Sequence, residues 1–109
     1  MKEPAVIARL WTGSTSVSDA PKYLSHLERN VIPELSSIAG HRGIYVLQQA
    51  EADTATFIVM TLWESMESIR RFSGPDVEAA VVAPDARAVL RSYERRATHY
   101  EVVLHSDTL

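Results

Sequence analysis

Apolar residues cluster in four short runs along the chain, each bounded by turn residues. The runs cover 5–12, 43–49, 55–64 and 96–105, and they are rich in β-branched and aromatic side chains. Runs of this length and composition are typical of β-strands. The short polar segment between the second and third runs predicts that these two strands form a hairpin.

Between the first two strands, apolar residues recur three or four positions apart, which predicts an amphipathic helix. Ser18 or Asp19 can cap this helix, and Pro21 suits its first turn, where a missing N–H costs nothing. Pro33 cannot donate a helical hydrogen bond, so we expect a kink just before it. The helix is then expected to continue as far as Gly40.

Two further helical segments are predicted in the second half of the chain. Ser65 is suited to cap a helix that ends at Gly74. Apolar residues then recur at helical spacing over 77–93, with a break at Pro84.

Both faces of the first and third strands are largely apolar, because side chains alternate across a strand. In the first strand, one face carries Ala8 and Leu10 and the other carries Ile7 and Trp11. The second and fourth strands are more polar, so the first and third are predicted to be central. This matches the split βαβ arrangement with strand order 4-1-3-2 and both helices on one face. We therefore predict an α+β, ferredoxin-like βαββαβ fold with a four-stranded antiparallel sheet.

The second face of such a sheet would be apolar and uncovered. A large exposed apolar patch is rare on a monomer, and an identical partner can cover it through a two-fold interface. We therefore expect a homodimer that pairs through its sheets as a dimeric α/β barrel. A monomer with one mixed face, or a topology with helices on both faces, remains the alternative.

Composition narrows the possible partners. The 109 residues are expected to form a single domain, 1–109, and 46% hydrophobic with 23% charged residues is ordinary globular composition. A net charge of -3 leaves no basic surface for nucleic acid. The chain has no cysteine and no stretch typical of a signal peptide or a membrane span, so we expect a cytoplasmic protein without membrane contact.

Two polar side chains on apolar strands are candidates for chemistry. His99 lies in the middle of the fourth strand, where a neutral imidazole could accept a proton, although it could equally be a hydrogen-bonded edge histidine. Arg9 could bind an anionic oxygen of a ligand, or it could form an ion pair with Glu101 or Asp76. None of the four histidines forms a metal-binding motif, so no metal is expected.

Four aromatic residues could line a pocket for a flat aromatic ligand: Trp63, Trp11, Tyr45 and Phe72. The alternative is that they form ordinary core, since aromatic side chains dominate core packing. No nucleophile elbow, P-loop, dinucleotide fingerprint or pair of catalytic carboxylates is present.

Several segments resemble small bacterial proteins of the antibiotic biosynthesis monooxygenase family. They are TLWESMESIRRFSGPDVEAAVVAPDARAVL at 61–90, THYEVV at 98–103, IARLW at 7–11 and AGHRG at 39–43. The most specific features are Trp-Glu-Ser at 63–65 and Phe-x-Gly-x-Asp at 72–76. The resemblance covers nearly the whole chain and implies a dimeric α/β barrel of ferredoxin-like units.

The resemblance also implies two kinds of activity, oxidation of polycyclic phenols by molecular oxygen alone or breakdown of haem. Trp63 matches the tryptophan of the phenol-oxidising members, but Val59 stands where they have an asparagine. The haem-degrading members have a tryptophan at the position of Phe72 and a histidine ligand just after it, and 76–83 contains no histidine, so haem is not expected.

The resulting hypothesis is a monooxygenase without a cofactor that acts on a small aromatic or phenolic substrate. In this hypothesis His99 accepts a proton, Arg9 binds the substrate anion, and the aromatic residues wall the pocket. The alternative is a module without catalytic activity that binds a small hydrophobic ligand.

Overall fold

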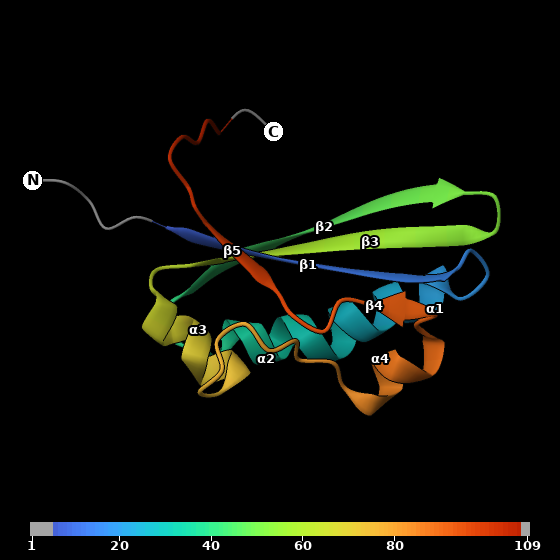
Figure 1. The fold of residues 1–109 in the computed structure, drawn as a ribbon, viewed down its shortest axis with the longest axis horizontal. Helices are drawn as coiled ribbons and strands as arrows, with labels where there is room; N and C mark the ends of the chain where they lie inside the picture. The colour runs from blue at the N-terminus through green and yellow to red at the C-terminus, as the bar shows by residue number, and fades with distance from the viewer. Residues whose placement is uncertain (1–5, 108–109) are drawn as a thin grey trace, which may run out of the picture.

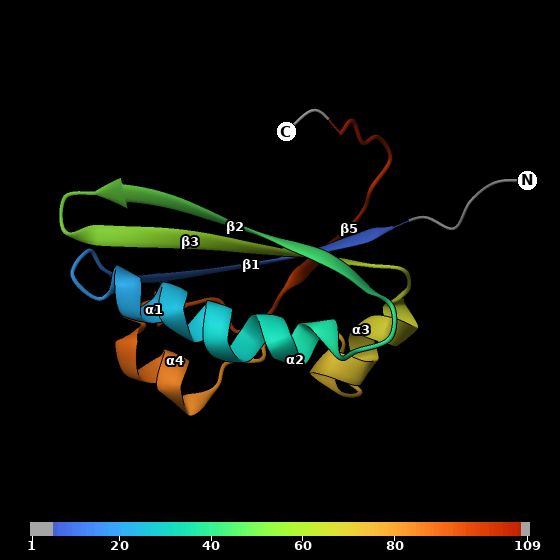
Figure 2. The same ribbon diagram turned by 180° about the vertical axis from the view of Figure 1, so that it is seen from behind.

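The protein is described by a computed structural model over residues 6–107, in which an antiparallel sheet carries helices along one face (Figure 1). The same arrangement seen from behind shows α1 and α2 running beneath the sheet (Figure 2). The elements in chain order are β1 (Ile7–Ser16), α1 (Ala20–His26), the π-helical turn η1 (Leu27–Val31), α2 (Ile32–Ser36), β2 (His41–Glu51), β3 (Thr54–Trp63), α3 (Met66–Ser73), α4 (Pro84–Val89), β4 (Ser92–Tyr93) and β5 (Thr98–Glu101).

The strand order is β2-β3-β1, and both β4 and β5 pair with the free edge of β1. All of these pairings are antiparallel, and β1 pairs with β3 from Ile7 opposite Trp63 to Ser16 opposite Thr54. The predicted α+β fold with its antiparallel sheet and central first and third strands is confirmed. Two short strands, β4 and β5, take the place of a single fourth strand, and of these only β5 lies within the predicted range 96–105.

The predicted bounds of the first and fourth strands were wrong. The first strand does not end at Gly13 but continues to Ser16, and the hydroxyls of Ser14 and Ser92 lie 2.7 Å apart across the sheet edge. Residue 5 lies outside the described part of the chain. The fourth strand was expected over 96–105, but β5 covers only Thr98–Glu101, and Val103 and Leu104 beyond it are strongly exposed.

Pro33 has the predicted effect on the first helix. The N–H of Ile32 donates to the carbonyl of Leu27, five residues earlier, so the turn before the proline is widened into η1. Such a turn accommodates a residue that cannot donate and whose ring would crowd the preceding turn. The helix ends at Ser36 rather than continuing to Gly40, which has a positive φ of 94°.

The second helix agrees with its predicted signals. The hydroxyl of Ser65 accepts a hydrogen bond from the N–H of Ser68 at 3.1 Å, which closes the N-terminus of α3. Gly74 follows the last turn with a φ of 85°, a conformation that favours glycine.

The helix predicted over 77–93 was wrong except for Pro84–Val89. Residues 75–83, which we call the strap, are not helical, and Ala79 pairs with Arg96 in an isolated β-bridge. The carbonyls of Val77 and Ala79 accept hydrogen bonds from the side chain of Arg9. A helix would have used these carbonyls internally, so the contact with a distant strand outweighs the local helical pattern.

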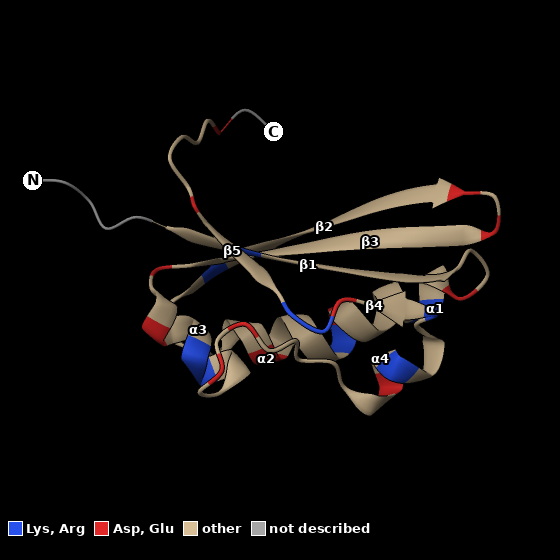
Figure 3. Cartoon of the chain, viewed as in Figure 1, with Lys and Arg blue, Asp and Glu red and all other residues tan. Residues whose placement is uncertain are grey.

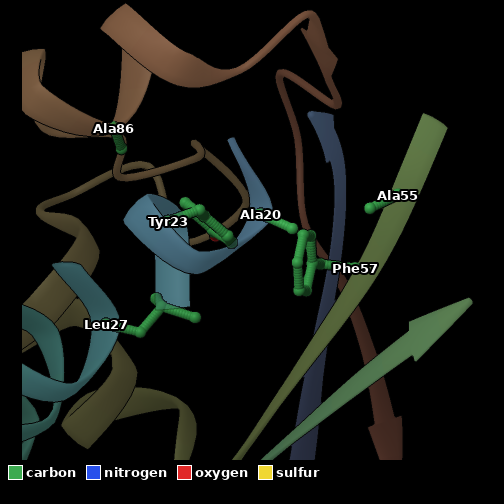
Figure 4. Packing of buried hydrophobic residues seen from close by; sticks show 6 residues of the cluster. All are labelled: Ala20, Tyr23, Leu27, Ala55, Phe57 and Ala86. Carbon is green, nitrogen blue, oxygen red and sulfur yellow. The ribbon is translucent and has the colours of Figure 1, made fainter. Parts of the chain in front are cut away.

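The core lies between the sheet and the helices in two clusters. Figure 4 shows the first, in which Tyr23 of α1 packs beside Phe57 of β3; the cluster comprises Ala20, Tyr23, Leu27, Ala55, Phe57 and Ala86. The second contains Leu35, Trp63 and Ile69, each at most 1% exposed. Among the described residues, no helix has both the length and the apolar composition needed to cross a bilayer.

The opposite face of the sheet, which we call the open face, has no helix over it (Figure 1). Cross-strand partners share a face, so Leu10, Met60 and Tyr45 lie together there. Acidic and basic residues are concentrated on the helices, the turns and the strap (Figure 3). The open face is therefore apolar around Leu10, Met60 and Tyr45, whereas its end toward the β2–β3 turn carries polar residues such as Thr12 and Thr56.

Candidate functional site

A cavity of about 120 Å³ lies between the sheet and the helices and opens at one side to solvent. Its floor is formed by side chains of β1 and β3, namely Arg9, Trp11, Val59 and Thr61. The helical segment 20–36 covers it, and the strap, α3 and α4 contribute Phe72, Val82 and Ala86. Most of the lining is apolar, so the few polar groups determine what the cavity can bind.

Arg9 is the only residue of the cavity floor with a formal charge, and its side chain is 4% exposed. Its Nη2 donates to the carbonyl of Ala79 at 2.7 Å, and its Nη1 donates to the carbonyl of Val77. These neutral carbonyls orient the guanidinium without neutralising it. Burial lowers the pKa of Arg9, but a guanidinium stays protonated in a protein.

No carboxylate of residues 6–107 forms an ion pair with Arg9. Asp76, one predicted partner, instead pairs with Arg96 at 3.0 Å. Glu101, the other, is exposed and lies opposite Ile7 in the β1–β5 pairing. The expected ion pairs of Arg9 are therefore not formed, and its buried charge has no carboxylate partner among residues 6–107.

His99 lies directly opposite Arg9 in the β1–β5 pairing, and its Nε2 is 2.9 Å from Nη1 of Arg9. A guanidinium can only donate, so Nε2 accepts and the imidazole proton resides on Nδ1. Burial lowers the pKa of His99, and the charge of Arg9 lowers it further. His99 does not line the cavity. The contact fixes the imidazole and the guanidinium relative to each other, and the predicted role of His99 as a proton acceptor stays a prediction.

Two of the four predicted pocket aromatics line the cavity, Trp11 and Phe72. Trp11 donates from Nε1 to the carbonyl of Glu94 at 2.7 Å, which holds its ring in place. The ring centroid of Phe72 lies 5.8 Å from Cζ of Arg9, a distance at which a cation and a ring face attract each other.

The other two aromatics are placed elsewhere, which corrects the expectation that they wall the pocket. Trp63 is fully buried, donates from Nε1 to Oγ1 of Thr61 at 2.8 Å, and stacks behind Phe72 with ring centroids 5.9 Å apart. Tyr45 lies on the open face opposite Met60.

Sequence reasoning missed the polar residues that the first helix presents to the cavity. Tyr23, His26, Asn30 and Glu34 recur three or four positions apart and all line it. Nδ2 of Asn30 and Nδ1 of His26 are 3.0 Å apart near the mouth. The sequence contains a signal for them. These polar residues recur at helical spacing on the same face of the helix as the apolar residues Leu27 and Leu35.

The chain thus belongs to the class of α+β proteins in which a ferredoxin-like unit has a mainly apolar cavity between its sheet and its helices. Within this class, residues 16–83 match the family model described as antibiotic biosynthesis monooxygenase. Since the match covers more than half of the 109 residues, the chain belongs to the antibiotic biosynthesis monooxygenase family.

Solved structures show the same fold at low sequence identity. A family protein from Bacillus cereus is 13% identical over 95% of this chain and 99% of its own, with a TM-score of 0.64. A haem degrader from Mycobacterium tuberculosis, with two haems bound in its active site, is 19% identical over 94% of this chain and 99% of its own, with a TM-score of 0.61. A monooxygenase from Streptomyces coelicolor in complex with nanaomycin D is 13% identical over 96% and 91%, with a TM-score of 0.53. No curated protein matches the sequence significantly.

Proposed function

We propose that this protein is a monooxygenase without a cofactor that oxidises a small phenolic substrate with molecular oxygen. The observation that carries the proposal is the buried guanidinium of Arg9, which lines an apolar cavity and has no carboxylate partner among the described residues. The family membership and the fold support the same class of activity.

Arg9 would act by favouring the ionised form of the substrate. A positive charge next to a phenolic oxygen lowers the pKa of the phenol, and the effect is large where water is excluded. The resulting phenolate is electron-rich and can pass electrons to oxygen directly. In the balanced reaction, a phenol and one molecule of oxygen give a quinone and one molecule of water.

The size of the cavity suits a compact substrate. An apolar cavity of about 150 Å³ can hold benzene, so 120 Å³ with an open mouth accommodates about one aromatic ring between Trp11 and Phe72. A haem macrocycle is much larger than this space, and we therefore derive no role for haem. The phenolic proton would leave toward water at the mouth, where His26 and Glu34 lie.

Oxygen consumption tests the proposal. The protein is incubated with phenol or naphthol, and uptake above the rate in buffer is followed with an oxygen electrode. With isotopically labelled oxygen, the quinone product should carry one labelled atom and the water the other. If these phenols bind but no oxygen is consumed, the protein is not a monooxygenase for this class.

The role of His99 can be separated from that of a proton acceptor by two substitutions. His99→Gln retains an oxygen that accepts from Arg9 but cannot titrate, so we expect it to keep most of the oxygen uptake, whereas His99→Ala loses about tenfold. In the wild type, protonation of His99 would break its contact with Arg9, so uptake should decline as the pH falls through the lowered pKa of His99. The part of this decline that His99 causes should be absent in His99→Gln, which keeps only the decline due to protonation of the substrate itself. An inactive His99→Gln would instead support a proton acceptor.

A module that binds a small hydrophobic ligand without catalysis is the second candidate. The specific observation that favours it is Val59, which lines the cavity at the position where the resemblance implies an asparagine. An apolar side chain there removes one hydrogen-bonding group from the site. Phenol binding without oxygen uptake would select this function over the first.

We further propose that the protein is a homodimer formed through the open face. The side chains of Tyr45, Leu47 and Tyr100 are 38%, 51% and 55% exposed, and the sheet between them is apolar. A second copy can cover this face by a two-fold interface without any other partner.

Met60, which lies opposite Leu10 near the centre of the open face, provides the test. We expect Met60→Glu to shift the species observed by sedimentation velocity from dimer to monomer, because a carboxylate would be buried without a partner. Val17→Glu, at an exposed apolar position in the β1–α1 connection, is the matched control and should remain dimeric. A wild-type protein of monomeric mass at micromolar concentration would rule out this interface.

A further inference from the structure

Tyr23 is a polar group of the cavity that the proposed reaction does not use. Its side chain is 3% exposed, and its ring centroid lies 5.0 Å from that of Phe57. The two side chains lie next to each other in the core (Figure 4). Tyr23 nevertheless lines the cavity, and its hydroxyl makes no hydrogen bond within residues 6–107. The hydroxyl oxygen is not one of the enclosed polar atoms that lack a partner, so it is accessible to solvent and open to an acceptor atom of a ligand.

The hydroxyl is also fixed in its neutral form. Burial raises the pKa of Tyr23 well above its ordinary value, so the group keeps its proton across the physiological range. It can therefore donate a hydrogen bond to an acceptor atom in the cavity under all conditions in which the protein works.

Tyr23 and Arg9 belong to opposite walls. Tyr23 is part of α1, which covers the cavity, and Arg9 is part of β1, which forms its floor. Apolar side chains such as Trp11 and Val82 lie among the remaining lining residues. Arg9 and Tyr23 thus place one charged and one neutral hydrogen-bond donor on opposite walls of an apolar space of about one ring.

We infer that Tyr23 is a second anchoring residue, which selects phenols whose ring also carries a carbonyl oxygen. The phenolate oxygen would bind Arg9, and the carbonyl oxygen would accept a hydrogen bond from the hydroxyl of Tyr23. This inference rests on the proposed function for the first contact and adds a specificity determinant to it.

Binding of two phenols of similar shape tests the inference. Para-hydroxyacetophenone carries a carbonyl, and para-isopropylphenol has an alkyl group of similar size in its place. Dissociation constants are measured by calorimetry for the full chain, for Tyr23→Phe and for Tyr100→Phe, which removes an equivalent hydroxyl on the open face. For each ligand, the dissociation constant of the variant is divided by that of the wild type. The different acidities of the two phenols then cancel when the two ratios are compared.

We expect Tyr23→Phe to weaken the binding of para-hydroxyacetophenone by about fivefold, which corresponds to one neutral hydrogen bond. The binding of para-isopropylphenol should not change. Tyr100→Phe should change neither. Equal effects of Tyr23→Phe on both ligands, or no effect on either, would overturn the role of Tyr23 while leaving the proposed function intact. If the wild type binds neither phenol, the site is not a phenol site and both proposals fail.

Discussion

Replacing Arg9 with methionine is expected to weaken the binding of phenolate ligands by about a hundredfold. A hydrogen bond to a charged group contributes about 1.5–3 kcal/mol, and among the described residues no other arginine and no lysine lines the cavity to replace the guanidinium. Methionine matches the length and apolar stem of arginine and so limits the change in packing.

Para-nitrophenol provides the measurement, because only its phenolate form absorbs visible light strongly. Bound to the wild type, the probe should ionise at a lower pH than in buffer, since the positive charge of Arg9 stabilises the anion. In Arg9→Met this lowering of the probe's pKa should disappear. Arg9→Lys keeps the positive charge but loses the planar guanidinium with its two parallel N–H donors. It should lower the pKa of the bound probe by an intermediate amount.

Arg96→Met is the matched control for Arg9→Met. Arg96 also holds the strap, through Asp76 at 3.0 Å and Glu78 at 3.4 Å, but it lies outside the cavity and is exposed. Its loss can loosen the strap without removing the charge from the site. If Arg9→Met stays folded and binds the probe as tightly as the wild type, the guanidinium is not the anion site.

The alternation of apolar residues along the strands and their spacing along the helices were enough to predict the order of the strands in the sheet. Both patterns are local properties of the sequence. They failed at the strap, where Val77, Ala80 and Val81 follow a helical spacing. There the backbone carbonyls are bound by Arg9, which is about 70 residues away in the chain. No local pattern contains that contact, so the pattern predicts a helix that tertiary structure prevents.

The placement of Tyr45 shows a second limit. His41 pairs with Trp63 on the helix side of the sheet, and regular alternation would bring Tyr45 to the same side. A β-bulge between His41 and Gly43 shifts the register, so that Tyr45 faces away from the cavity. One extra residue in a strand reverses every later side chain, and the sequence carries no clear sign of it.

Trp63 and Trp11 show why aromatic content alone does not define a pocket. Both were expected to touch the ligand, and both belong to central strands on the helix-covered face. Trp63 is covered by α3 and packs with Leu35 and Ile69, whereas Trp11 reaches the cavity and remains partly exposed. Which of the two reaches the ligand depends on the helices above them, whose positions the strand sequences do not contain.

The two tryptophans should therefore respond in opposite ways to substitution. Trp63→Ala is expected to lower the free energy of unfolding by about 3–5 kcal/mol, a large part of the stability of a small protein. Trp63→Phe keeps most of the packing and should fold, with a smaller loss of stability and a para-nitrophenol affinity within about twofold of the wild type. Trp11→Leu should lower the free energy of unfolding less and weaken the binding of para-nitrophenol more. The reason is that it removes a flat wall of the cavity and lies at a partly exposed position.

Urea denaturation gives the stability of each variant, and titration with para-nitrophenol gives its affinity. The comparison uses Trp63→Phe and Trp11→Leu, since both are expected to remain folded at the concentrations of a binding experiment. If Trp63→Phe weakens the probe more than Trp11→Leu does, then Trp63 contacts the ligand. In that case the cavity must rearrange around Phe72 when the ligand binds. In the structure Phe72 lines the cavity, and Trp63 stacks behind it.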